Sequence, residues 1–191
     1  MTTELATWLA DEAIVKILKG KDPVAKLKAL RETDHPQAQF LWAIFRDIFH
    51  YVAVHLAEIA DSAREVDFAM RWGFGMKQGP FELWQEAGWL QVAQWIKEDI
   101  EAGKALCAAP LPAWVFEGPV AQAGGVHTPE GSWSPSQGRF VGVSRLPVYA
   151  RQLFPETVKG AAPVDALKAG TQVFKNDEVR VWTLVMCPSK S

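Results

Sequence analysis

Three glycines and a proline, Gly73, Gly75, Gly79 and Pro80, have the residue types of a phosphate-binding loop. In a dinucleotide-binding loop, glycines spaced G-x-G-x-x-G follow a strand and open a helix whose free N–H groups bind the pyrophosphate. Here the third glycine comes one residue late, residues 63–72 before it have a helical pattern, and Pro80 lacks an N–H donor. The spacing favours a turn between two helices, so no cofactor-binding residue is predicted.

A second group that could do chemistry consists of His50, His55 and Glu58. The two histidines are five residues apart on a predicted helix and point in different directions, whereas a paired metal site uses i, i+4 spacing. His55 and Glu58 could meet at i, i+3, but amphipathic helices supply such pairs freely. His35 and His127 lie near a helix start and a turn, and both are predicted to be solvated. A metal or hydrolytic enzyme therefore remains the weakest hypothesis, with no catalytic or metal-binding residue predicted.

Composition excludes several classes of protein. A chain of 191 residues with a net charge of −2 can bury one core, but it lacks the basic surface that nucleic-acid binding requires. Cys107 and Cys187 lie far apart and form no metal or disulfide pattern. The acidic N-terminus has no signal-peptide pattern, and no uninterrupted apolar run reaches the roughly 18 residues of a membrane span. The expected location is the cytoplasm.

Helices must position these residues, because apolar side chains repeat every three or four positions through the first half of the chain. Helices are expected over residues 4–19 and from Pro23. A long apolar helix should begin at an Asp34–Gln37 capping box and end near Ile59. We expect it to be a central core helix.

Three shorter helices are expected next. Ser62 and Glu65 have capping-box spacing and should open a helix that ends at Gly73. Gly79-Pro80 should start another helix, and residues 89–102 a third, closed by Gly103. The region to residue 103 is therefore predicted to be all-α.

The remaining sequence changes character. Residues 126–133 predict a β-hairpin around the turn at 128–131, residues 139–143 predict another strand, and residues 155–171 resemble a linker. Strand character returns around Asn176-Asp177. We divide the chain into N-terminal connector helices (1–35), a helical domain (36–115), a β-hairpin appendage (116–154), and a linker with a terminal strand pair (155–191).

The segment EIADSAREVDFAMRWGFGMKQGPFELWQEAGW, residues 58–89, resembles the C-terminal helical domain of the 3-hydroxyacyl-CoA dehydrogenase family. The residues that carry this resemblance form a D-x-A-M helix and a G-x-x-x-GPF-E-L turn: Asp67, Ala69, Met70, Gly73, Gly75, Gly79, Pro80, Phe81, Glu82 and Leu83. Residues 40–60, 146–160 and 173–184 are similar to the long bacterial multifunctional members, in which an enoyl-CoA hydratase portion follows. The likeness covers roughly residues 36–184.

The resemblance implies a mainly α bundle of the 6-phosphogluconate dehydrogenase C-terminal-like type, with a small β-hairpin and an extended tail. It also implies a role in fatty-acid β-oxidation, where the full enzyme oxidises 3-hydroxyacyl-CoA with NAD. The NAD-binding Rossmann domain and the catalytic His–Glu pair of that family have no counterpart in this sequence, so we expect the chain alone to be inactive.

Two positions depart from the family pattern. An ungapped alignment places Trp42 where the family has an asparagine that touches acyl-CoA, and Gln85 where it has an aspartate. These departures suggest the second of two helical copies found in long members, so the alternative is an interaction module that binds no acyl-CoA. The expected partners are the Rossmann and hydratase portions, acyl-CoA, and a second copy in a homodimer.

Overall fold

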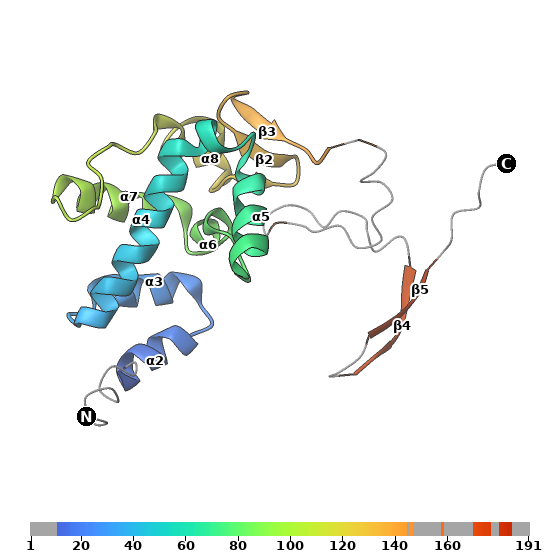
Figure 1. Ribbon diagram of the computed structural model, residues 1–191, viewed down its shortest axis with the longest axis horizontal. Helices are drawn as coiled ribbons and strands as arrows, with labels where there is room; N and C mark the ends of the chain where they lie inside the picture. The colour runs from blue at the N-terminus through green and yellow to red at the C-terminus, as the bar shows by residue number, and fades with distance from the viewer. Residues whose placement is uncertain (1–10, 145, 147–157, 159–169, 177–179, 185–191) are drawn as a thin grey trace.

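The computed structural model describes residues 11–144, 146, 158, 170–176 and 180–184, and it confirms a mainly helical chain with a small antiparallel sheet (Figure 1). The described helices are α2 (Glu12–Lys19), α3 (Pro23–Glu32), α4 (Pro36–Ile59), α5 (Ala63–Phe74), α6 (Pro80–Glu86), α7 (Trp89–Glu101) and α8 (Gly118–Ala123), with a 3₁₀ turn, η1, at Ala113–Val115. The first part of the helix expected over residues 4–19 lies outside the described residues.

The helix starts follow local side-chain chemistry, with one correction. The Asp22 side chain caps α3, and Pro23 occupies its first position, where no N–H is needed. The predicted Asp34–Gln37 capping box of α4 is wrong. His35 is the N-cap, and its Nδ1 accepts a hydrogen bond from the Gln37 backbone N–H at 3.2 Å. Pro36 then takes the first helical position and sets the start one residue later than predicted.

The ends of α5 also differ from prediction. Ser62 is its N-cap, but the Ser62 hydroxyl donates to the Glu65 carboxylate and makes no hydrogen bond to the backbone. Gly73 does not end the helix. Gly75 does, with φ of 66° in the left-handed region that a residue without Cβ enters freely.

The β-structure lies where the sequence predicts it. β1 (His127–Thr128), β2 (Gly131–Ser134) and β3 (Arg139–Val141) form an antiparallel sheet in the order β1-β2-β3. β4 (Gly170–Lys175) and β5 (Arg180–Leu184) form a separate antiparallel pair. The sequence prediction missed α8, a short helix that begins with Gly118-Pro119 and ends at Gly124.

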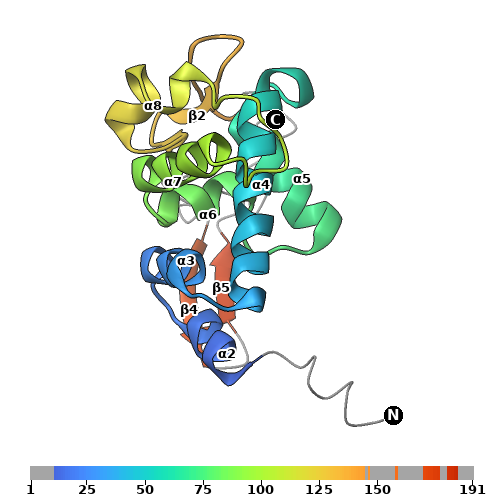
Figure 2. The same ribbon diagram turned by 90° about the vertical axis from the view of Figure 1, so that its left-hand side faces the viewer.

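A core of buried side chains runs from α2 through the helices into the small sheet. At its centre, Trp84 stacks on Phe49 at 5.5 Å and on Trp89 at 4.1 Å between ring centroids. Further ring contacts continue from Trp89 through Trp114 to Trp133 of β2. Figure 2 shows α4 running alongside α5, α6 and α7. The helices and the sheet therefore share one apolar interior.

The long helix α4 is central, as expected, but only one of its faces is buried. Trp42, Phe49 and Leu56 are almost fully buried, whereas Phe40 is 66% exposed and Tyr51 is 58% exposed. By length and mean hydropathy alone α4 could cross a membrane, although the sequence has no uninterrupted run of that length. Its buried side packs on α3, α5 and α6 as a core helix does.

Candidate functional site

Asp67 of α5 joins the start of α6 to the small sheet. Its side chain is fully buried. Asp67 Oδ1 accepts a hydrogen bond from the Phe81 N–H at 2.9 Å, and Oδ2 accepts one from the Glu82 N–H at 3.1 Å. His127 Nε2 of β1 lies 2.7 Å from the same Oδ2. One carboxylate thus connects α5 to the next helix and to a strand residue 60 positions further along the chain.

The start of α6 leaves few donors for a ligand. The Gly79 N–H donates to Glu82 Oε2 at 2.8 Å, Pro80 has no N–H, and the next two N–H groups bind Asp67. Residues 63–74 before the loop are helical rather than a strand. A nucleotide phosphate needs free N–H groups at this position. These residues therefore do not fit NAD, and no step of a reaction is assigned to them.

The resemblance residues divide into two groups in the structure. Asp67, Gly79, Phe81 and Glu82 are brought together, and a Cβ built on Gly79 would lie 2.3 Å from the Asp67 Cα. Pro80 opens α6 beside them. Gly73 lies in the last turn of α5, and Gly75 caps that helix; a Cβ on either would meet nothing within 4 Å. The first group packs α6 on α5, and the second only shapes a turn.

His127 was predicted to be solvated, and this prediction is wrong. The His127 side chain is fully buried, with Nδ1 2.8 Å from the Ser132 hydroxyl. The Gln85 side chain holds the His127 backbone: its amide NH₂ donates to the His127 carbonyl at 2.8 Å, and its oxygen accepts from the His127 N–H at 2.9 Å. Gln85, the departure from the family pattern, therefore pairs α6 with β1.

Asp67, His127 and Ser132 are hydrogen-bonded in the same sequence as the acid, histidine and serine of a catalytic triad. Their burial does not suit that role. A nucleophilic serine must reach substrate. Ser132 is fully buried within β2, and these residues line neither of the two hollows described below. Burial raises the pKa of the Asp67 carboxyl, and the hydrogen bond and charge of His127 offset only part of that rise. The arrangement joins α5 to the small sheet through buried hydrogen bonds.

The histidines of α4 act separately. His50 is buried, with Nε2 2.7 Å from the Ala109 carbonyl oxygen. His55 Nδ1 lies 2.9 Å from Glu58 Oε2 on the surface. Within the described ranges, no group of three or more His, Cys, Asp or Glu side chains is placed to hold a metal ion. Nothing in this geometry favours the metal or hydrolytic hypothesis.

Trp42 lies at the position that the resemblance associates with substrate contact. It is 2% exposed, and its indole N–H donates to Asp99 Oδ2 at 2.8 Å. Arg46 Nη1 donates to the same oxygen at 3.2 Å. Burial lowers the pKa of Arg46, but the hydrogen bonds to Asp47 and Asp99 outweigh it, so the pKa is raised. These residues border a polar hollow of about 320 Å³. The Trp42 indole N–H already donates to Asp99 and is not open to a ligand in that hollow.

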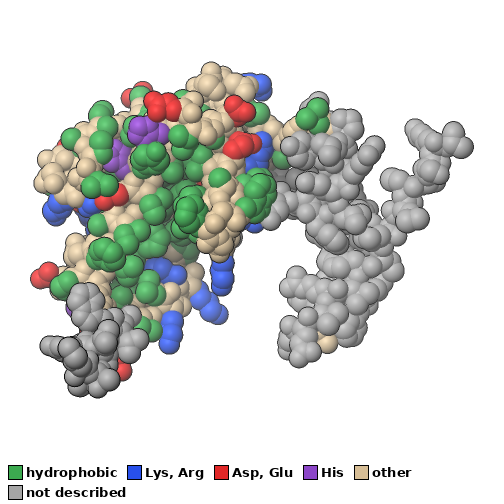
Figure 3. All heavy atoms as spheres, in the orientation of Figure 1, with side chains coloured by type: hydrophobic (Ala, Val, Ile, Leu, Met, Phe, Trp, Pro, Cys, Tyr) green, Lys and Arg blue, Asp and Glu red, His purple; other side chains and the backbone are tan. Residues whose placement is uncertain are grey.

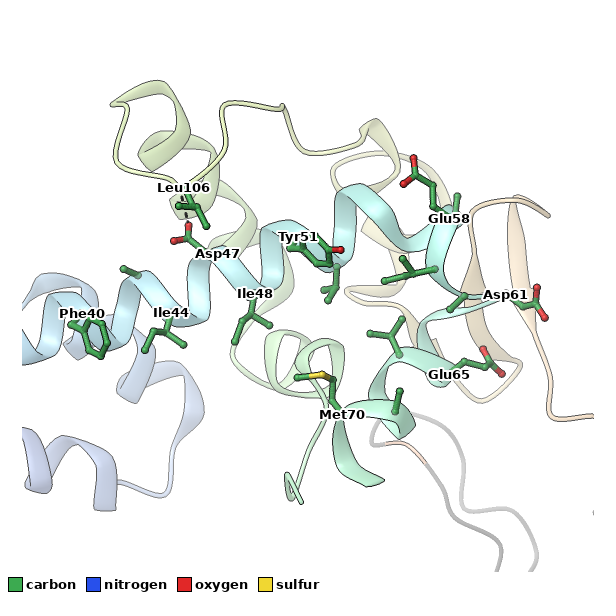
Figure 4. Close-up of a pocket in the computed structure, with 17 residues that line it drawn as sticks. Phe40, Ile44, Asp47, Ile48, Tyr51, Glu58, Asp61, Glu65, Met70 and Leu106 are labelled. Atoms are coloured by element: carbon green, nitrogen blue, oxygen red, sulfur yellow. Dashed lines mark hydrogen bonds between the residues drawn. The ribbon is translucent and has the colours of Figure 1, made fainter. Parts of the chain in front are cut away.

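A larger hollow of about 1110 Å³ lies along α4 and α5. Figure 3 shows hydrophobic side chains gathered over these helices, and Figure 4 shows Phe40, Ile44 and Tyr51 along α4 with Met70 of α5 opposite. We call this hollow the α4–α5 groove. Most of the residues that line it are apolar.

Comparison with known proteins gives one informative match. Residues of this chain are 34% identical, over 111 positions, to a probable 3-hydroxyacyl-CoA dehydrogenase of Bacillus subtilis strain 168. The match supports a relation to the 3-hydroxyacyl-CoA dehydrogenases. It covers 58% of this chain but only 13% of the relative. No family model and no solved structure matches.

Sequence reasoning missed His127 and Ser132 as partners of Asp67. Asp67 and His127 are 60 residues apart. No spacing rule links a helix residue to a hairpin residue over that distance. The alternation around His127 indicates a strand but not the face on which the ring is buried.

Proposed function

We propose that this chain is a non-catalytic helical module of a 3-hydroxyacyl-CoA dehydrogenase, corresponding to the C-terminal helical domain of the long bacterial form. In the full enzyme, NAD-dependent oxidation belongs to other parts of the polypeptide, and this module closes the substrate side and contacts its neighbours. The sequence match supports the relation. The observation that carries the non-catalytic part is that Asp67, Glu82 and the N–H groups of the GPF turn bind one another.

The direct test is a dehydrogenase assay on the chain alone with acetoacetyl-CoA and NADH. The expected result is no oxidation of NADH above background, because no described residues are arranged to bind the cofactor. The intact relative, assayed under the same conditions, is the positive control. Turnover by the isolated chain would contradict the proposal.

A second candidate is an interaction module that binds no acyl-CoA. The burial of Trp42 favours it, because the indole N–H that could face a substrate is already bound to Asp99. Calorimetry with acetoacetyl-CoA separates the two candidates. Lys28→Ala changes an exposed residue and is the control. If the heat of binding disappears in Arg46→Ala and persists in Lys28→Ala, the result would favour substrate-side closure at the polar hollow. No heat with any variant would favour the interaction module.

A further inference from the structure

The α4–α5 groove exposes apolar surface without a partner in the described structure. Phe40, Tyr51, Ile59 and Ile44 of α4 are 66%, 58%, 48% and 39% exposed, and all line the groove. Side chains of this size on one face of a helix are ordinarily covered in a folded or assembled protein. The groove follows α4 from Phe40 to Glu58, a length of about 27 Å at 1.5 Å per residue.

Charge at the groove is one-sided. Its lining contains Asp47 partway along α4, the carboxylates of Glu58, Asp61 and Glu65 at the junction of α4 and α5, and no lysine or arginine (Figure 4). Asp47 and Glu65 are each paired with the arginine next to them in sequence, Arg46 and Arg64. The last turn of α4 has no basic residue, so Glu58 adds negative charge to the negative end of the helix dipole. The Glu58 side chain contacts His55 through Oε2 but is 73% exposed, so an incoming cation can still reach it. Three of the four carboxylates in the groove therefore lie at one end, and the fourth, Asp47, is paired with Arg46.

We propose that the α4–α5 groove binds one amphipathic helix of a protein partner, about 18 residues long, with lysines or arginines in the turn that lies against Glu58 and Asp61. Helix-in-groove recognition uses an apolar stripe at i, i+3, i+4 and i+7 for affinity, and charge at the rim fixes the direction of the helix. This inference stands apart from the relation to dehydrogenases, since it depends only on the shape and charge of the groove.

Two other occupants fit the observations less well. A second copy would bring another acidic rim to the groove, because its own α4–α5 groove has the same lining and no basic residue. A fatty acyl chain would fill the apolar part but would gain nothing from the carboxylates at the end. A basic amphipathic helix satisfies both the apolar and the acidic parts.

The test uses a displayed library of 18-residue peptides with leucines fixed at i, i+3, i+4 and i+7 and all other positions random, selected against the immobilised 191-residue chain. The expected binders carry lysine or arginine concentrated in one terminal turn. A selected peptide should lose about tenfold in affinity for Glu58→Lys/Asp61→Lys, and more for Ile44→Asp.

Two control variants distinguish binding in the groove from non-specific binding elsewhere on the surface. Leu90→Asp replaces a similarly exposed apolar side chain outside the groove, and Glu101→Lys reverses a distant exposed carboxylate. Both variants should bind as the parent chain does, and circular dichroism should show that all variants remain folded. The proposal is overturned if no peptide is selected, if binders show no basic enrichment, or if the groove variants bind normally. A chain dimer that Ile44→Asp dissociates would assign the groove to a second copy instead.

Discussion

Asp67 shows how a single buried side chain can link several elements. It accepts hydrogen bonds from two backbone N–H groups of α6 and contacts the ring of His127. A carboxylate in the interior is costly unless such partners satisfy it. The aspartate is therefore a packing residue, and changes to it should alter stability.

Replacing Asp67 with asparagine should lower the free energy of unfolding by about 2–4 kcal/mol. The new amide NH₂ would face at least one N–H donor where the carboxylate accepts. Chemical denaturation followed by circular dichroism measures the change. Asp61→Asn, at an exposed position, is the control and should change stability by less than about 0.5 kcal/mol.

Gly79 and Gly73 form a matched pair. Alanine at Gly79 would place its Cβ against the Asp67 backbone, so we expect a loss of about 1–3 kcal/mol. Alanine at Gly73 meets nothing within 4 Å and replaces a glycine inside α5, so it should stabilise the chain by about 0.5–1 kcal/mol. Thermal unfolding should move in opposite directions for the two variants; equal shifts would refute this account of the motif.

The buried carboxyl also predicts a pH dependence. Because burial raises the pKa of Asp67 in the folded chain, the folded state holds this proton more tightly than the unfolded state. The contribution of Asp67 to stability is then fully present below the ordinary aspartate pKa and is lost as pH rises through the folded-state pKa. Carbon-13 NMR of the Asp67 carboxyl should show a midpoint above the ordinary value, and a midpoint below it would contradict the prediction.

At the scale of elements, α4 has two apolar faces, of which one is buried and the other is exposed. One face fills the core with Trp42, Phe49 and Leu56, and the other lines the α4–α5 groove. The small sheet shares the core through Trp133 and is also held by polar contacts from α5 and α6. Removing one of these polar contacts should lower the stability of the sheet locally.

Gln85→Ala should loosen the sheet while leaving α4 unchanged. It removes both hydrogen bonds to the His127 backbone and the side chain against which Gly125 packs. Hydrogen exchange of residues 126–134 should become about tenfold faster, with no change over residues 42–56. Gln94→Ala, which loses only an exposed contact with Glu98, serves as the comparison and should leave both regions unchanged.

For the whole molecule, helices and sheet share one interior. The ring contacts that begin at Phe49 reach Trp133 and Phe140 through the tryptophans of α6, α7 and η1. Residues from Ile14 to Trp133 form a single core cluster. Such a core favours one cooperative transition.

We therefore expect tryptophan fluorescence and far-ultraviolet circular dichroism to give the same denaturation midpoint. Fluorescence reports mainly on the stacked tryptophans, and circular dichroism reports on the helices. Trp133→Phe removes the reporter in the sheet without emptying its position and should leave the midpoints coincident. Two separate midpoints would show that the sheet and the helices unfold independently.

The sequence by itself determined the helices from α2 to α7, though not α8, because proline positions, polar caps and apolar periodicity act within a few residues. Pro23, Pro80 and the 126–133 hairpin fall where those rules put them. It also predicted that the glycine stretch lies between two helices, as α5 and α6 show. Local rules failed at Asp34, where His35 competes as the cap, and at Gly73, where α5 continues to Gly75.

Only the tertiary structure decided which apolar side chains of α4 are buried and which face the groove. It also decided that His127 lies inside the molecule beside Asp67. Both outcomes depend on which distant elements pack together. Burial and long-range hydrogen bonding are properties of that packing, and no short stretch of sequence contains them.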